Sequence, residues 1–225
     1  MPPLVESVRL LYDHLGLGLV AALLFAAGLA TSVATVRGDV RWMMALPLWL
    51  VRRVLRAIGP DFPAVRVFLV IFCFNSVAIF LYMASGVLVV LPAFVAFLTG
   101  VNIGVIVLKA PELEVPDADR PVADAMHAAD DADVPQWVSL CGFAVLVLEL
   151  PSFWLSVGMG IGMGRALTRV GQFTLANMRA LLAERAAAYV TLIVPVLLLS
   201  ALAETAAIRG HVQARPPSQT DDDGE

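Results

Sequence analysis

Residues 67–108 read VFLVIFCFNSVAIFLYMASGVLVVLPAFVAFLTGVNIGVIVL, and this stretch decides the fold class. It contains no Asp, Glu, Lys, Arg or His. About 20 apolar residues in an α-helix cross the hydrocarbon core of a bilayer, so the stretch is too long for one crossing. Ser85-Gly86 lies near its middle and is the natural place for a turn. We therefore predict two transmembrane helices, at 67–84 and 87–108.

Three further blocks have the length and composition of transmembrane helices. Residues 15–36 carry no charge, residues 137–164 carry only Glu149, and residues 186–208 carry only Glu204. We expect the helix at 137–164 to bend at Pro151. The sequence thus predicts an all-α, polytopic bundle of five spans in one domain, residues 1–208. A polar, acidic tail at 209–225 follows, and we expect it to be disordered.

Two other stretches combine apolar and basic residues in a pattern typical of helices that lie in the membrane interface. We predict such amphipathic helices at 41–58 and 165–183, because several arginines make a bilayer crossing costly. We expect their arginines to contact lipid head groups: Arg52, Arg53 and Arg56 in the first helix, and Arg165, Arg169 and Arg179 in the second.

Composition and charge agree with a membrane protein. Hydrophobic residues make up 60% of the chain and charged residues 15%, against about 45–50% and roughly 25% in soluble domains. Twelve of the 19 carboxylates lie in a linker at 109–135 or in the last five residues, so the rest of the chain is basic. A basic membrane body suits anionic lipids, and nothing in this pattern calls for nucleic acid.

The distribution of basic residues gives an expected orientation. With five spans, the segment 37–66, the acidic linker and the tail share one face, which carries 10 of the 15 Lys and Arg residues. The positive-inside rule then places the N-terminus outside the cell membrane.

Glu149 is the first candidate for a functional residue, because an ionisable group halfway along an apolar helix usually faces the bundle interior. One interpretation is a proton or cation site. The other is a neutral carboxyl that hydrogen bonds a neighbouring helix, with Asn75, Thr99 or Asn102 as its partner. The sequence leaves both interpretations open.

Glycines form a second pattern that favours helix packing. Small residues four positions apart let helix backbones approach closely in lipid. The residues concerned are Gly100, Gly104, Gly158, Gly160, Gly162 and Gly164. The alternating glycines continue an apolar span rather than follow a strand, so they are no dinucleotide fingerprint.

Motifs for catalysis do not occur in the sequence. There is no HExxH, no GxSxG and no P-loop, so an ATP-driven step would need a separate ATPase subunit. His127 and the nearby aspartates of the linker match no metal-ligand spacing. Cys73 and Cys141 lie in apolar blocks and indicate neither a disulfide nor a metal site. We expect a non-enzymatic protein without catalytic, cofactor-binding or metal-binding residues.

Three motifs, taken in order, resemble the stage II sporulation protein M family, also called DUF95. They are Asn75-Ser76, Thr99-Gly100 with Gly104, and Glu149-Leu150-Pro151 followed by the glycines up to Gly164-Arg165-Ala166-Leu167. The resemblance covers about residues 67–182. The family pattern has Asn-Asn, Asn-Gly-x-x-x-Gly and Pro-His-Gly-x-x-Glu-Leu-Pro at these places. Here Ser76 replaces the second Asn, Thr99 the Asn before Gly100, and Ala144-Val145-Leu146 the Pro-His-Gly.

The resemblance implies a multi-pass membrane component that acts with partners, as a scaffold or assembly subunit of a cell-envelope or export complex. Other membrane or envelope proteins would bind it, and the sequence leaves a homo-oligomer open. The alternative is a permease or channel subunit with Glu149 in a proton- or cation-linked pathway. An intramembrane enzyme is the weakest hypothesis, because no span presents a His or second carboxylate at the depth of Glu149.

Overall fold

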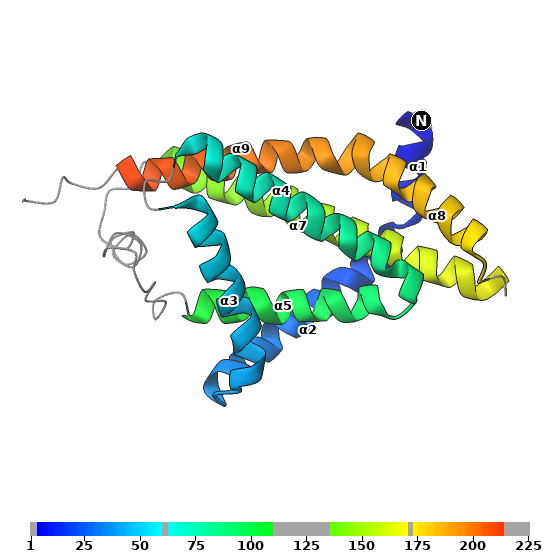
Figure 1. The fold of residues 1–225 in the computed structure, drawn as a ribbon, viewed down its shortest axis with the longest axis horizontal. Helices are drawn as coiled ribbons and strands as arrows, with labels where there is room; N and C mark the ends of the chain where they lie inside the picture. Colours follow the sequence, from blue (N-terminus) through cyan, green and yellow to red (C-terminus); the bar gives the residue numbers. More distant parts are fainter. Residues whose placement is uncertain (1–3, 60–62, 110–135, 171–172, 214–225) are drawn as a thin grey trace, which may run out of the picture.

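The computed structural model describes residues 4–59, 63–109, 136–170 and 173–213, and every regular element in these ranges is helical (Figure 1). The predicted acidic linker beyond Lys109 lies outside the described residues, as does the predicted tail from residue 214 on. The first residues of that tail, 209–213, belong to a helix instead, because α9 continues to Gln213. The helices, in chain order, are α1 (Leu4–Asp13), α2 (Leu15–Arg37), α3 (Arg41–Ile58), α4 (Ala64–Ala84), a 3₁₀ turn η1 (Ser85–Leu88), α5 (Leu91–Lys109), α7 (Gln136–Val170), α8 (Leu175–Ala188), a π turn η3 (Tyr189–Ile193) and α9 (Val194–Gln213).

Five helical stretches are long and apolar enough to cross a membrane, which confirms the predicted fold class. They are Leu15–Arg37, Ala64–Leu88, Leu91–Lys109, Gln136–Arg169 and Leu175–Gly210. The turn between the second and third of these begins at Ser85, where the sequence predicts it. The chain is thus an all-α, multi-pass membrane protein.

The long helices alternate in direction and leave their connections at two ends of the bundle. In Figure 1, α2, α5 and α9 run one way, and α4 and α7 run the other way. One end carries α3, the end of α5, the start of α7 and the end of α9. The other end carries α1, η1, the end of α7 and α8.

The closest helix pair is α2 with α5, which meet at backbone level. A Cβ at Gly100 would overlap the carbonyl oxygen of Phe25, and a Cβ at Gly28 would overlap a carbonyl oxygen of α5. One turn further on, Gly104 lies against the side chain of Ser32. Residue numbers rise together along both helices at these contacts, so the two helices are parallel. Small residues four apart on both helices permit this approach.

The alternating glycines of α7 face two different neighbours. Successive residues of an α-helix are about 100° apart, so glycines two positions apart lie on nearly opposite sides. The first and third glycines pack on the start of α2, and the second and fourth pack on the end of α4 and the turn after it. The contacts are Gly158 with Gly18, Gly162 with His14, Gly160 with Met83 and Gly164 with Val89.

Helix α3 runs across one end of the bundle at a steep angle to α5 (Figure 1), and its location in the membrane interface stays a prediction. It continues through Pro47, which is buried. Met44 packs on α5 at Val101 and Val105. The three arginines of the predicted head-group set, Arg52, Arg53 and Arg56, are exposed.

The predicted amphipathic helix at 165–183 has other boundaries in the structure. Residues 165–170 form the last turns of α7, and a separate helix begins at Leu175 and passes through η3 into α9. The reason for the new start is a helix cap: Thr174 is extended, and its hydroxyl accepts a hydrogen bond from the Asn177 amide at 3.2 Å. Helix α7 continues through Pro151, and the bend expected there stays a prediction. Arg165, Arg169 and Arg179 are exposed.

Replacing Gly100 with valine should separate α2 from α5, because the new side chain would overlap the backbone of α2. We expect the free energy of unfolding to fall by about 2 kcal/mol or more. The measurement is thermal unfolding of the purified protein in detergent micelles. Gly142→Val is the matched control, because no atom lies within 4 Å of a Cβ at Gly142, and its stability should change by at most about 0.5 kcal/mol. Equal stability of the two variants would contradict the proposed role of Gly100.

Candidate functional site

Glu149 lies at the meeting of three helices. From α4, the Asn75 side-chain amide donates a hydrogen bond to Glu149 Oε1 at 2.8 Å, and from α9 the Ser200 hydroxyl donates to the same oxygen at 3.0 Å. Glu149 itself is half-buried, and Ser200 is fully buried. The carboxyl therefore joins α4, α7 and α9, while Oε2 makes none of the described hydrogen bonds.

Glu204 is a second carboxylate at this site. It lies one turn beyond Ser200 on α9, so both side chains share a face of that helix. It is close enough to Glu149 for the two carboxyl groups to interact electrostatically. From the sequence we expected no second carboxylate beside Glu149, and Glu204 stood out only as the one charge of the span at 186–208. The four-residue spacing from Ser200 was the available signal, but it does not say which helix that face meets.

Of the three partners considered for Glu149, only Asn75 reaches it. Thr99 and Asn102 belong to α5, and neither is bonded to Glu149. Thr99 donates instead to the carbonyl of Val95 in its own helix at 2.8 Å. Because α5 packs mainly on α2, its polar residues lie away from the junction of α4, α7 and α9.

A second polar contact joins α4 to the C-terminal helix beside Asn75. The hydroxyl of Tyr189 donates to the carbonyl oxygen of Ser76 at 2.5 Å. Tyr189 opens the π turn η3, and π turns widen a helix locally and often occur at functional sites. Two hydroxyl oxygens in this region, those of Ser76 and Ser156, are buried without a described hydrogen-bond partner. Buried polar groups usually have one, so these hydroxyls mark places where water or a ligand could bond.

Glu149 lies near the middle of the membrane-crossing band. About 20 helical residues cover a hydrocarbon core of about 30 Å, so a band centred on Glu149 would end roughly ten residues away in α7. Met159 lies ten residues after Glu149 in α7, toward the end of the bundle that carries α1. The contact partner Asn75 is also central in its span, Ala64–Leu88.

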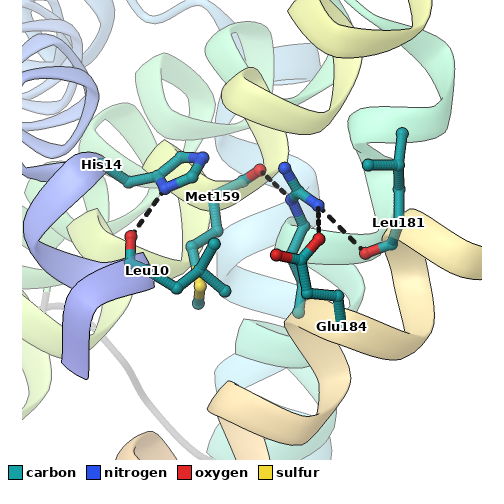
Figure 2. A network of polar contacts seen from close by, with 6 residues as sticks. Leu10, His14, Met159, Leu181 and Glu184 are labelled. Atoms are coloured by element: carbon teal, nitrogen blue, oxygen red, sulfur yellow. Dashed lines mark hydrogen bonds and ion pairs between the residues drawn. The ribbon is translucent and has the colours of Figure 1, made fainter. Parts of the chain in front are cut away.

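At the edge of this band, Arg185 of α8 forms a network with α7 (Figure 2). The residue is only 4% exposed. Nε donates to the carbonyl oxygen of Met159 at 3.2 Å, and Nη1 donates to the carbonyl oxygen of Leu181 at 3.1 Å and to Glu184 Oε2 at 3.2 Å. Arg185 lies between the two elements predicted from the sequence, the amphipathic helix at 165–183 and the span at 186–208. Its position beside the glycines of α7, which expose the backbone there, explains why a guanidinium can reach the Met159 carbonyl.

These groups can bind a proton or a small cation and can hold helices together. Among the described residues, no group of three or more His, Cys, Asp or Glu side chains could hold a metal ion. At Glu149, one carboxyl oxygen accepts hydrogen bonds from Asn75 and Ser200. The carboxylate of Glu204 interacts with this group electrostatically.

Comparison with known proteins adds no assignment. No family model, no curated protein and no solved structure matches this chain. The resemblance to the stage II sporulation protein M family therefore stays a prediction from the sequence.

Glu149→Leu should lower the free energy of unfolding by about 1–3 kcal/mol, because Asn75 and Ser200 would lose their acceptor in an apolar interior. Glu149→Gln keeps an acceptor oxygen and should stay within about 1 kcal/mol of the natural protein. Thermal unfolding in detergent measures both. The control is Val147→Leu, which adds a leucine on the exposed side of the same helix. If the Leu and Gln variants were equally stable, the hydrogen bonds of Glu149 would not hold the helices together.

Proposed function

We propose that this chain is a non-enzymatic, multi-pass protein of the cell membrane that serves as a scaffold or assembly subunit of a cell-envelope or export complex. The observation that carries the proposal is the backbone-level contact at three helix interfaces, those of α2 with α5, α2 with α7, and α7 with the α4–α5 turn. Helices in such contact cannot slide past one another without steric overlap. A bundle of fixed shape is suited to hold partners in place.

The first half of α7 supplies a surface on which another membrane protein could pack. Its large apolar side chains point away from the bundle, and Gly142 among them has open space where a Cβ would be. The exposed residues of this flank are Trp137, Leu140, Phe143, Leu146 and Val147. A free glycine amid large apolar residues is a place where a second helix can approach closely in lipid. The family resemblance, which implies a component that acts with partners, supports the same proposal.

Deleting residues 112–133 tests the scaffold proposal, because this acidic linker is the extramembrane segment predicted to bind a partner. We expect a stoichiometric partner that cross-links to the full chain in native membranes to be lost from the deletion variant. Thermal unfolding of the deletion variant should match that of the full chain. A second variant keeps the full length of the linker but has its Asp and Glu residues changed to Asn and Gln. It distinguishes an effect of the linker's charge from an effect of its length. Unchanged co-purification in both variants would count against the linker as the binding segment.

A second candidate function is a permease or channel subunit, and the Glu149 site favours it. Two interacting carboxyl groups inside a bundle are expensive, and intramembrane ionisable residues commonly mark proton or ion pathways. The π turn at Tyr189 and the unbonded hydroxyls of Ser76 and Ser156 fit a polar route along α4, α7 and α9. The fixed glycine contacts speak against large helix movements, so this function would require conduction without rocking of the bundle.

Flux measurements on protein reconstituted in vesicles test this second candidate. A proton- or cation-dependent flux should fall about tenfold or more in Glu149→Gln, because the amide keeps the hydrogen bonds but cannot carry a proton or a negative charge. Glu184→Gln is the matched control, since that carboxyl side chain is 54% exposed and lies outside the central band. A flux that Glu149→Gln leaves unchanged would remove Glu149 from any pathway.

A further inference from the structure

Helix α1 carries both exposed apolar and exposed charged side chains. Leu4 is 61% exposed, Val5 77% and Tyr12 73%, whereas two leucines of α1 pack against the core of the bundle. The charged residues Glu6 and Asp13 are also exposed, and they line the side of the helix toward α8. Exposed apolar residues are stable next to acyl chains, so the apolar side chains of α1 are suited to contact lipid.

Between α1 and α8 lies a cavity of about 340 Å³, which we call the α1–α8 cavity. Its charged lining is Glu6, Arg9 and Asp13 from α1 and Glu184 from α8. The volume falls at the lower end of the range for small-molecule sites, about 300–1,000 Å³. The α1–α8 cavity is therefore large enough for a small polar group.

The walls of the α1–α8 cavity are held by hydrogen bonds. Thr191 donates to the hydroxyl of buried Ser7 at 3.1 Å, which ties α1 to the π turn. His14 Nδ1 bonds the carbonyl oxygen of Leu10 at 2.7 Å at the end of α1, as Figure 2 shows. On the other wall, Glu184 pairs with Arg185, whose guanidinium is bonded to α7. The cavity thus belongs to the fold and is not a chance gap between side chains.

The depth of the α1–α8 cavity matches that of lipid head groups. Arg185 is bonded to Met159, which lies about ten residues from Glu149 at the edge of the central band. Glu184, next to Arg185, is therefore at the boundary between acyl chains and head groups. The run of residues without charge that leads into α9 begins directly after Arg185, and the span of α2 begins at Leu15, directly after α1.

The charges of the cavity select the kind of head group. Glu184 already has a cation in Arg185, which leaves Glu6 and Asp13 to bind an ammonium group and Arg9 to bind a phosphate. A primary ammonium can donate three hydrogen bonds to carboxylates, whereas a trimethylammonium can donate none. We propose that the α1–α8 cavity binds the head group of an aminophospholipid of the phosphatidylethanolamine type.

The test uses the full chain purified in detergent and titrated with lipid, with bound lipid counted by native mass spectrometry. Phosphatidylethanolamine should bind at a concentration about tenfold lower than phosphatidylcholine with the same acyl chains. Equal binding of the two lipids would overturn the proposal, and this comparison needs no variant. Soluble phosphoethanolamine is the third probe. If it bound as tightly as the lipid, the cavity would be a site for a soluble amine and the lipid assignment would be wrong.

Variants then locate the site. The double variant Glu6→Gln, Asp13→Asn should lose the preference for phosphatidylethanolamine, and Arg9→Gln should weaken the binding of both lipids. Asp39→Asn is the control, because Asp39 is an exposed, paired carboxylate that follows the end of α2, whereas α1 precedes its start. It should leave the preference unchanged. A preference that persisted in the double variant would place the lipid elsewhere and overturn the assignment to this cavity.

Discussion

The close approach of helix backbones is the contact on which the rest of this structure depends. In lipid, apolar side chains gain little by leaving the solvent, so helices associate through van der Waals contact and hydrogen bonds. Here glycines bring α2 within backbone contact of both α5 and α7. Two other glycines of α7, Gly160 and Gly164, pack against the end of α4 and the turn between α4 and α5. One helix, α7, thus fixes the positions of both halves of the bundle.

Polar groups occupy two levels in this packed arrangement, and each level has a different role. At the centre, Glu149 bonds α4 and α9 and interacts with Glu204. At the edge, Arg185 bonds α7, and the charged face of α1 encloses the α1–α8 cavity. The central level lies where charge is most expensive, and the edge level lies where lipid head groups supply partners of their own.

The sequence predicted the spans well, because the thickness of a bilayer sets how long an apolar helix must be. It predicted the turn at Ser85 for the same reason. It did not predict which helix each polar residue meets. Asn75, Thr99 and Asn102 were equivalent candidates for Glu149, and only the order of neighbouring helices separates Asn75 from the other two. Ser200 was not considered at all, since a lone serine in an apolar span gives no signal.

The sequence pattern also did not predict the helix boundaries in the region after α7. Arginines at helical spacing suggested one amphipathic helix, but the cap at Thr174 starts a new helix that continues into α9. Arg185 within it is buried because the backbone of α7 is accessible beside Gly158 and Gly160. A periodicity along one helix cannot report a feature of another helix.

The parallel pairing of α2 with α5 has a consequence for biogenesis. Two parallel spans cannot be consecutive hairpin partners, so the chain must insert α4 in the opposite direction before α5 can pair with α2. Until then, the small-residue face of α2 around Gly28 has no partner from this chain. At about 5–20 residues per second, ribosomes take several seconds to make the intervening chain. During that interval the first span depends on lipid, on the insertion machinery, or on a second copy of itself to cover Gly28.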